Sequence, residues 1–288
     1  MIVLETHNLT HTYSAGTPFE KKALDDVSIE VEKGALIGII GHTGSGKSTL
    51  IQHLNGLLRP TSGTVRLDGK DIWEQPKQIR SVRFRVGMVF QYPEYQLFEE
   101  TVYKDIAFGP KNMGLSEEEI DARVRRAASF VDLKEGLLGK SPFELSGGEK
   151  RRAAIAGVMA MEPEVLILDE PTAGLDPRGR EQILEQVLDF RRENGTTVLL
   201  VSHSMEDVAQ VAEQVLVMHK GGVAMFDETE AVFDRAEELS AMGLSVPAVT
   251  QIFIGLKQRG IDLGQNAYTI DQAFTTLLPL LKGGGRHA

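Results

Sequence analysis

One stretch constrains this chain more than any other: an apolar run, a glycine-rich turn and the residues Gly46-Lys47-Ser48-Thr49. Residues 37–40 are aliphatic or glycine, and Leu50, Ile51 and Leu54 recur with helical spacing after the turn. The pattern G-x-x-x-x-G-K-[ST] therefore stands between a predicted strand and a predicted helix. That context is the one a phosphate-binding loop requires.

The spacing follows from the chemistry of polyphosphates. Backbone N–H groups and the N-terminus of the following helix can solvate the negative charges once water has left. Glycines keep that approach free of Cβ atoms. Lys47 is expected to reach the β- and γ-phosphates, and the Ser48 hydroxyl to bind Mg²⁺. The residues expected to hold ATP or GTP are Gly41, His42, Thr43, Gly44, Ser45, Gly46, Lys47, Ser48 and Thr49.

Composition narrows the possible partners. The chain has 288 residues, a net charge of −10 and no cysteine. The acidic balance argues against a broad basic surface for nucleic acid, and the lack of cysteine excludes disulfides and thiol catalysis. No apolar run approaches the roughly 18 residues of a membrane-spanning helix, and the N-terminus has no signal-peptide core. If the protein acts at a membrane, another chain must supply the spanning part.

Apolar segments that end in polar residues recur along the chain. Buried strands are predicted over residues 86–90, 165–169 and 197–201, with helical patterns between them. This alternation is typical of a doubly wound α/β sheet, with the site at the carboxyl ends of its strands. Further strands and hairpins are expected at residues 2–7, 27–31, 64–72 and 216–226.

The pattern becomes helical over residues 94–163. Ser116 and Glu119 have capping-box spacing ahead of a one-sided apolar run, and a small-residue helix follows Leu145–Glu149. Lys150-Arg151-Arg152 is interpreted as the solvated start of that helix. Beyond residue 230, amphipathic helices are predicted over 231–242, 246–259 and 270–281, and a flexible tail from Gly283 onward.

Polar residues at strand ends supply a candidate catalytic set. Asp169 ends an aliphatic run and is placed to hold Mg²⁺ through water, and Glu170 to polarise the attacking water. His203 follows the next strand and can hydrogen-bond the γ-phosphate or orient Glu170. Gln91 can hold Mg²⁺ or the attacking water with its amide. Tyr13 has two open interpretations, an aromatic that stacks on the base or a half-buried strand residue.

The ordered set of motifs resembles the nucleotide-binding domain of the ABC ATPase family over about residues 1–230. Leu-Ser-Gly-Gly is its most specific part. The set comprises Tyr13, Gly41–Thr49, Gln91, Leu145–Glu149, Val165–Glu170, Ala173–Asp176 and Ser202-His203. The resemblance implies a P-loop α/β core with an antiparallel β subdomain, a helical subdomain over about 94–163 and a helical C-terminal extension over 231–288.

The resemblance also implies a head-to-tail dimer that sandwiches two ATP molecules. Ser146, Gly147 and Gly148 of one subunit would close over the γ-phosphate held by the loop of the other. Asp176 would lie on the segment that crosses the dimer interface. Glu149 departs mildly from the family, in which Gln is also frequent.

The same resemblance assigns roles within one subunit. Tyr13 would stack on the adenine, and Gln91 would sense Mg²⁺ and the membrane partner. Glu170 would be the catalytic base, and His203 would contact the γ-phosphate. With Ser48 and Asp169, Gln91 completes the expected metal-binding set.

A narrower resemblance is to the ATPases of energy-coupling factor (ECF) transporters, which import vitamins and transition metal ions. It rests on Val89–Val102, Ala154–Pro163 and Gly243–Pro247, and Tyr92-Pro93-Glu94 is more similar to the second of the two ECF ATPase paralogues. It implies an identical or paralogous ATPase partner, a transmembrane coupling protein and a separate substrate-binding membrane protein. It also implies a peripheral place on the cytoplasmic face of the membrane and a dimerisation role for the extension.

Acidic residues near Gln91 suggest how such a partner would be recognised. Glu94, Glu99 and Glu100 are expected to form a groove for arginine-bearing coupling helices. An ordinary acidic surface is the alternative.

Two other classes of function stay open at this point. A soluble ABC ATPase of DNA repair or translation would need no membrane partner, although the acidic balance counts against it. A regulatory nucleotide-binding subunit would need little catalysis, and the presence of both Glu170 and His203 counts against that.

Overall fold

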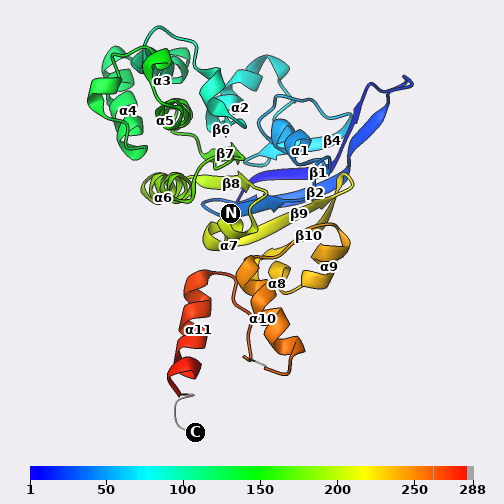
Figure 1. The fold of residues 1–288 in the computed structure, drawn as a ribbon. Helices are drawn as coiled ribbons and strands as arrows, with labels where there is room; N and C mark the ends of the chain where they lie inside the picture. Colours follow the sequence, from blue (N-terminus) through cyan, green and yellow to red (C-terminus); the bar gives the residue numbers. More distant parts are fainter. Residues whose placement is uncertain (262, 284–288) are drawn as a thin grey trace.

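The structure, a computed structural model, describes residues 1–261 and 263–283, and its central layer is a six-stranded sheet (Figure 1). The strand order is β10-β9-β3-β8-β7-β6, parallel throughout except that β10 pairs antiparallel with β9. The bounds are β3 Leu36–Ile40, β6 Val86–Val89, β7 Val165–Asp169, β8 Thr197–Val201, β9 Gln214–His219 and β10 Gly222–Glu228. The predicted α/β sheet is confirmed, and the carboxyl ends of β3, β8 and β7 meet at one edge.

A second, antiparallel sheet lies beside the first, in the order β2-β1-β4-β5. Its strands are β1 Ile2–Tyr13, β2 Lys21–Glu32, β4 Ser62–Leu67 and β5 Lys70–Asp71. The expectation of two short strands at 2–7 and 27–31 was wrong, because both strands continue into a polar hairpin arm that pairs Tyr13 with Lys21. Register shifts within this pairing interrupt the alternation of apolar residues and hide the strands from a periodicity argument.

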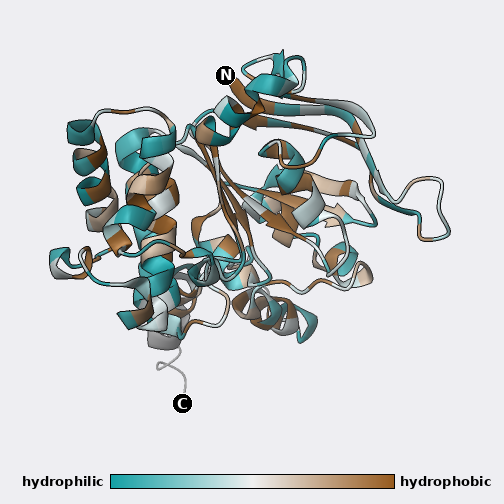
Figure 2. Ribbon diagram, turned by 90° about the horizontal axis from the view of Figure 1, so that it is seen from above, coloured by the Kyte–Doolittle hydropathy of each residue, from teal (hydrophilic) through white to brown (hydrophobic). Residues whose placement is uncertain are grey.

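The helix after the glycine-rich loop lies between the two sheets. Helix α1 (Lys47–Leu54) buries Leu50, Ile51 and Leu54 completely. These residues join a core cluster built from both sheets, which includes Ile37 and Ile39 of β3. Figure 2 shows the hydrophobic strands at the centre and hydrophilic residues on the outer helices. The loop is thus anchored at both ends in the apolar interior.

Helices occupy the expected segment between β6 and β7. They are η2 Pro93–Gln96, α3 Val102–Asn112, α4 Glu117–Phe130, η3 Glu135–Leu137, η4 Pro142–Glu144 and α5 Gly147–Met159. They follow η1 Pro76–Gln78 and α2 Ile79–Arg85. The predicted capping box of Ser116 and Glu119 is confirmed, with both reciprocal hydrogen bonds present. Val124, Ala127 and Ala128 of α4 are buried.

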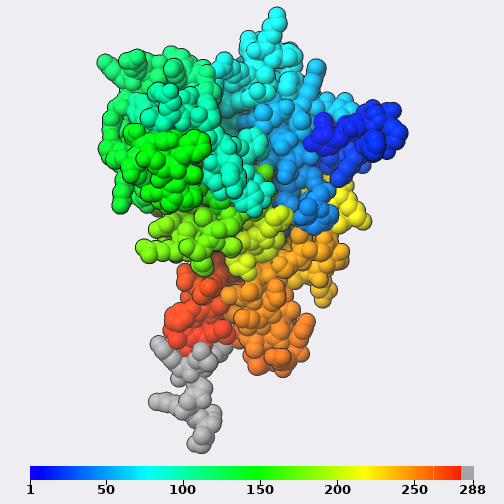
Figure 3. Space-filling view, turned by 45° about the horizontal axis from the view of Figure 1, so that its top comes forward, coloured from blue at the N-terminus to red at the C-terminus, as the bar shows by residue number. Residues whose placement is uncertain are grey.

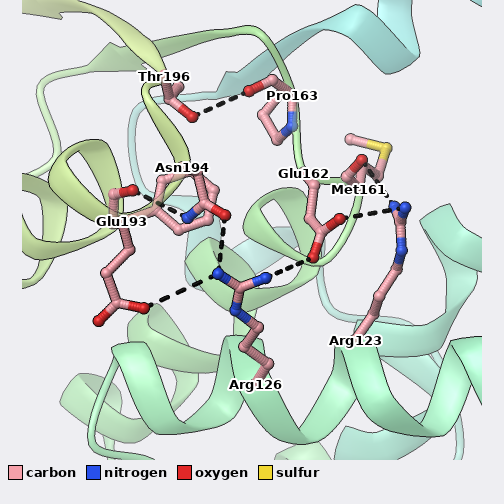
Figure 4. A network of polar contacts seen from close by, with 9 residues as sticks. Arg123, Arg126, Met161, Glu162, Pro163, Glu193, Asn194 and Thr196 are labelled. Atoms are coloured by element: carbon pink, nitrogen blue, oxygen red, sulfur yellow. Dashed lines mark hydrogen bonds and ion pairs between the residues drawn. The ribbon is translucent and has the colours of Figure 1, made fainter.

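Two arginines of α4 tie this helical segment to the rest of the molecule (Figure 4). Arg123 donates to the carbonyl of Met161 and pairs with Glu162, both at 3.1 Å. Arg126 bonds Glu162 and, at 3.0 Å, Asn194 at the end of α6 (Pro177–Asn194). The turn after α5 is therefore fixed from two sides.

The C-terminal region packs on the edge of the central sheet next to α7 (Met205–Val211). One helix was expected over 231–242, but the structure has two, because the chain turns at Asp234, whose carboxylate accepts bonds from Tyr268 and Asn266, each at 2.6 Å. The helices are α8 Thr229–Phe233, α9 Ala236–Ala241, α10 Ala248–Gln258 and α11 Ile270–Gly283. Residues 284–288 of the expected tail lie outside the described residues.

The outline of the molecule is uneven (Figure 3). In the space-filling view the helical segment and the β1–β2 hairpin lie on opposite sides, and the C-terminal helices extend below them. Among residues 1–261 and 263–283, no helix has the length and apolar character needed to cross a bilayer.

Candidate functional site: a pocket at the strand ends

A pocket of about 370 Å³ opens at the carboxyl ends of β3, β7 and β8. It brings together eleven of the residues singled out in the sequence. They are Tyr13, Thr43, Gly44, Gly46, Lys47, Ser48, Thr49, Gln91, Asp169, Glu170 and His203. Segments that are up to 190 positions apart in the chain therefore meet in one place, as the strand-end argument predicted.

The glycine-rich loop is shaped by its own surroundings as much as by any ligand. Gly46, the N-cap of α1, has φ +107, and a Cβ there would lie 2.7 Å from the carbonyl oxygen of Ala23. Gly44 has φ +80 with open space around its Cβ position. Thus the expectation that all the loop glycines clear a path for phosphate holds only in part, since Gly46 is needed for packing against β2.

Lys47 is a buried cation inside the loop. Its Nζ donates to the carbonyl oxygens of Gly41 at 2.5 Å and His42 at 3.2 Å. Burial lowers the pKa of Lys47, while the charges of Glu170 and Asp169 oppose that shift. A cation held this way among dipoles and carboxylates suits an anionic ligand that supplies further negative charge.

The two carboxylates at the end of β7 are protonated more easily than free carboxyl groups. Burial raises the pKa of Asp169, and Lys47 opposes the shift. Burial also raises the pKa of Glu170 to about 7, with the backbone N–H of His203 opposing it and the charge of Asp169 adding to it. A carboxyl group with a pKa near neutrality can take up a proton and release it again, as a general base must.

His203 borders Glu170 through both its backbone and its ring. Its N–H donates to Oε2 of Glu170 at 3.3 Å, and its Nε2 lies 3.4 Å from Oε1. Burial, followed by the charge of Lys47, lowers the pKa of His203. Glu170 itself has φ 53, a left-handed backbone that places its side chain toward the pocket wall shared with His203. Of the two roles left open for this histidine, orientation of Glu170 has direct geometric support.

Tyr13 lies at the mouth of the pocket and is 39% exposed. Its hydroxyl is 3.3 Å from that of Thr49, and the ring of His11 packs against it edge-on with centroids 4.5 Å apart. Lys21, the strand partner of Tyr13, also lines the pocket. Lys21, Ala23 and Val201 are lining residues that the sequence argument missed. Recognition that the two hairpin strands extend as far as Tyr13 and Lys21 would have predicted Lys21, because these two residues are strand partners.

Several predicted residues lie elsewhere. Gly41, His42 and Ser45 belong to the loop but do not line the pocket. Ser146, Gly147, Gly148 and Asp176 do not line it either. Ser146 is the N-cap of α5, in a capping box with Glu149, and Asp176 caps α6 by accepting the N–H of Gly179 at 2.7 Å. The pocket within one chain therefore contains the N-terminus of α1 but not the N-terminus of α5, which carries Gly147 and Gly148.

The oxygen donors in the pocket fit a magnesium ion. Ser48, Gln91 and Asp169, which all line the pocket, offer a hydroxyl, an amide and a carboxylate oxygen. Hard oxygen donors with few carboxylates suit Mg²⁺ that is shared with phosphates. No group of three or more His, Asp or Glu side chains able to hold a metal occurs in the described part of the chain.

Arg151 and Glu94 differ from what the sequence suggested. Arg151 was interpreted as solvated but is only 4% exposed. It forms a two-pronged ion pair with Glu94, with distances of 3.0 and 2.8 Å, and donates to the carbonyl of Ala173 at 2.6 Å. Glu94 is consequently engaged inside the molecule and does not contribute a free charge to an acidic groove.

A second groove of about 460 Å³ lies between α2, η2, α3 and α5, next to Phe90. Its lining is largely apolar and aromatic. The charged residues that line it are Arg80, Arg83 and Asp105, so the three glutamates of the expected acidic groove are not part of it.

Comparison with known proteins places this geometry in a family. The model of the ABC transporter family, "ABC_tran", matches residues 24–173. The chain is 57% identical to the energy-coupling factor transporter ATP-binding protein EcfA2 of Clostridium tetani, and the match covers 96% of each protein. It is 53% identical to the EcfA2 of Clostridium acetobutylicum, with 98% of this chain and 99% of that one covered.

The chain belongs to the ABC transporter ATPases. Within this family it groups with the ATP-binding proteins of ECF transporters, of the second paralogue. The soluble repair or translation ATPase considered as an alternative is not favoured by these relatives.

Solved structures agree with this assignment. The ABC ATPase resembles cbiO1 of Clostridium perfringens, described as part of the ABC transporter complex cbiONQ, with a TM-score of 0.74 and 40% identity over 83% of this chain and 94% of that one. It also resembles a dimeric ATP-binding cassette in a post-hydrolysis state bound to ADP and Pi, with a TM-score of 0.70 and 27% identity over 78% of this chain and 98% of that one. The predicted ABC-type fold is confirmed.

Proposed function

We propose that this ABC ATPase hydrolyses ATP with Mg²⁺ on the cytoplasmic face of the membrane and energises an ECF importer. Its partners would be a second ATPase subunit, a transmembrane coupling protein and a substrate-binding membrane protein, and its cargo a vitamin or transition metal ion. The observation that carries the proposal is the pocket in which Lys47, Asp169, Glu170 and His203 converge on the glycine-rich loop.

The residues of the loop would hold the phosphates. The N–H groups of Gly41–Thr49 and the N-terminus of α1 solvate the β- and γ-phosphates, and Lys47 neutralises them. Ser48, Gln91 and Asp169 would hold Mg²⁺, which would offset the negative charge of the phosphates. Tyr13, half-exposed at the pocket mouth, would stack on the adenine.

Glu170 would act as the general base. With its pKa near 7 it is deprotonated in a useful fraction of molecules, and it can accept a proton from the water that attacks the γ-phosphorus. The backbone N–H of His203 holds Oε2 of Glu170 at 3.3 Å. With a lowered pKa, the His203 ring stays neutral at pH 7 and can donate one N–H to the γ-phosphate.

The second wall of the nucleotide site would come from the other ATPase subunit. Ser146, Gly147 and Gly148 at the N-terminus of α5 are absent from the pocket of their own chain, and Ser146 is exposed. In a head-to-tail dimer they would face the γ-phosphate of the partner, with Asp176 at the interface. The dimeric arrangement of the similar cassette supports this proposal.

The proposal also covers the domain organisation of the chain. Residues 1–230 would form the ATPase domain, with the helical subdomain at about 94–163, and residues 231–288 a dimerisation extension. Large apolar side chains on the extension support it: Ile252, Ile270 and Phe274 are 58%, 77% and 62% exposed. Apolar exposure of this kind is typical of a surface that another protein covers.

The aromatic groove beside Phe90 would receive the coupling helix of the membrane protein. It lies at the residue before Gln91, so a partner seated there would touch the chain next to the nucleotide pocket. Arg80 and Arg83 contribute positive charge to its lining, whereas the carboxylate of Asp105 is buried and accepts the N–H groups of Phe98 and Glu99. The partner helix would therefore present apolar residues and acidic side chains.

Replacement of Glu170 by Gln tests the proposal. The variant keeps the size and polarity of the side chain but cannot accept the proton, so we expect kcat to fall by about 100-fold or more while ATP still binds. Single-turnover hydrolysis and equilibrium ATP binding on the full chain measure the two quantities. Unchanged hydrolysis in the Glu170→Gln variant would refute the catalytic assignment.

A further inference from the structure

Arg151 connects three segments that the proposed cycle must coordinate. It lies in the first turns of α5, directly after Ser146–Gly148. Its guanidinium reaches Glu94 of η2, three residues beyond Gln91, and the carbonyls of Pro171 and Ala173, directly beyond Glu170. The nucleotide, the membrane partner and the second subunit would each act on one of these segments.

All three nitrogens of the Arg151 guanidinium donate hydrogen bonds. Nε and Nη2 form a fork with the two oxygens of Glu94 at 3.0 and 2.8 Å. Nη1 donates to the carbonyl oxygens of Ala173 at 2.6 Å and Pro171 at 3.3 Å. A planar group that bonds a carboxylate on one edge and two carbonyls on another fixes the relative position of both.

Both partners of the Arg151–Glu94 ion pair are largely buried. The side chain of Arg151 is 5% exposed and that of Glu94 17%. Burial disfavours the charge on Glu94, but the hydrogen bonds from Arg151 and from its own backbone N–H, together with the charge of Arg151, outweigh burial and lower the pKa of Glu94. Removal of either partner would leave the other charge buried without compensation, so η2 and the loop after Glu170 are held together through this one side chain.

The loop that Arg151 holds contains the proposed base. The N–H of Ala173 bonds the carbonyl of Glu170 at 3.1 Å, and the N–H of Glu170 bonds Val201 at 3.0 Å. Neither Arg151 nor Glu94 lines the nucleotide pocket. Arg151 would therefore influence hydrolysis through the position of the backbone that follows Glu170.

We infer that Arg151 is a positioning residue for ATP hydrolysis: with Glu94 it sets the place of the loop at 170–176 relative to the segment after Gln91. The inference rests on the proposed function of Glu170. A shift of η2 by a membrane partner would be transmitted to the base through a rigid ion pair, and a shift of the loop by the second subunit would be transmitted the other way.

The test compares three variants of the full chain with a matched control. Arg151→Met removes all four hydrogen bonds, Arg151→Lys keeps only the charge, and Glu94→Gln keeps the volume of the partner. The control is Arg123→Met, because Arg123 also bonds one glutamate and one backbone carbonyl (Figure 4) and does not line the nucleotide pocket. Steady-state hydrolysis gives kcat and KM for MgATP.

We expect kcat of Arg151→Met to fall by about tenfold or more with KM within about twofold, since a displaced base affects turnover and leaves nucleotide binding intact. Arg151→Lys and Glu94→Gln should fall by about three- to tenfold, and Arg123→Met should match the wild type. Hydrogen exchange should accelerate at the amides of Ala173 and Leu175 in the Arg151 variants only. A merely structural role would not produce this split.

Equal kcat in Arg151→Met and Arg123→Met, or a rise of KM in step with the loss of kcat, would overturn the inference. If Arg151→Met does not fold, Glu94→Gln decides by the same criteria. Failure of the proposed function is separate: it would appear as normal hydrolysis by Glu170→Gln, whereas failure of this inference alone leaves Glu170→Gln inactive and the Arg151 variants unaffected.

Discussion

Two helix N-termini in this molecule carry glycines and face solvent or a pocket, yet they are built differently. Helix α1 begins at Gly46, whose left-handed backbone provides no side-chain cap, and no acidic residue occupies its first turn. Helix α5 begins at Ser146, which forms a complete capping box with Glu149. The first terminus has free N–H groups and a buried lysine, and the second has a carboxylate of its own.

The difference indicates which half of the nucleotide site is formed in advance. At α1 the loop, Lys47 and the carboxylates of β7 are fixed by the core, so an isolated chain can bind phosphate there. At α5 the Glu149 carboxylate accepts the N–H of Ser146 at 2.8 Å and its hydroxyl at 2.7 Å. In the proposed dimer, the γ-phosphate held by the second subunit would approach next to that negative charge.

The largest effect is expected when one methyl group is added at the N-terminus of α1. Gly46→Ala introduces a Cβ 2.7 Å from the Ala23 carbonyl oxygen at φ +107, which should destabilise the fold by about 1–3 kcal/mol and weaken ATP binding by about 100-fold or more, because the loop must move. Chemical unfolding and equilibrium binding of ATP to the full chain measure both effects.

Gly147→Ala is the matched substitution at the other terminus. A Cβ at Gly147 meets nothing within 4 Å, so the free energy of unfolding should stay within about 0.5 kcal/mol of the wild type and ATP binding to the isolated chain should be unchanged. ATP-driven dimerisation should weaken by about tenfold, since the methyl group would crowd the partner's phosphate. Weaker ATP binding to the monomer would contradict a site divided between two subunits.

Sequence reasoning succeeded where a residue's position follows from its own neighbours. Asp169, Glu170 and His203 directly follow buried strands, and parallel strands bring such ends together. It failed for Arg151, which looked like one member of an exposed basic triplet. The helical spacing of Arg151 with buried Ile155 and Met159 was the available signal, because residues four apart share a helix face.

The rest could not follow from local pattern. The extent of β1 and β2 depends on pairing between polar residues on the two arms of a hairpin, with interrupted register. The engagement of Glu94 depends on a residue 57 positions away. The proposed placement of Ser146 opposite a phosphate depends on a second chain, so it does not follow from the local pattern of this sequence.

A further prediction uses pH to separate the two helix termini. Because the pKa of Glu170 is raised to about 7, the base is largely protonated at pH 6 and ionised at pH 8, so kcat should rise by about tenfold between these values. The pKa of Glu149 at the other terminus is lowered by hydrogen bonds from the Ser146 hydroxyl and N–H, so that carboxylate stays charged throughout. The pH profile of kcat measured in single turnovers checks this.

The raised pKa of Glu170 should also make the free energy of unfolding depend on pH, with stability falling where kcat rises. The folded state holds a proton on Glu170 between the ordinary carboxyl pKa of 4.5 and its raised pKa of about 7, so stability is lost as the pH rises through this window. Relative to wild type, Glu170→Gln should therefore gain on the order of 2–3 kcal/mol between pH 4.5 and pH 8. A wild-type and variant difference that does not change with pH would show that Glu170 is not desolvated.

The smallest effect concerns the carboxylate at α5. Glu149→Gln keeps the capping box, because an amide oxygen can accept the N–H of Ser146, but removes the negative charge beside the partner's γ-phosphate. The ATP concentration for half-maximal dimerisation should fall by about threefold, as measured by light scattering.

Glu144→Gln is the control, since Glu144 caps η4 with Ser141 in the same way and lies outside the proposed interface motif. If both variants shift dimerisation equally, the effect comes from net charge, and if neither does, the carboxylate of Glu149 turns away when the subunits meet. Only a shift confined to Glu149→Gln supports a difference between the two termini that is electrostatic: one built to receive a phosphate, the other holding a charge that must be tolerated when the second subunit closes.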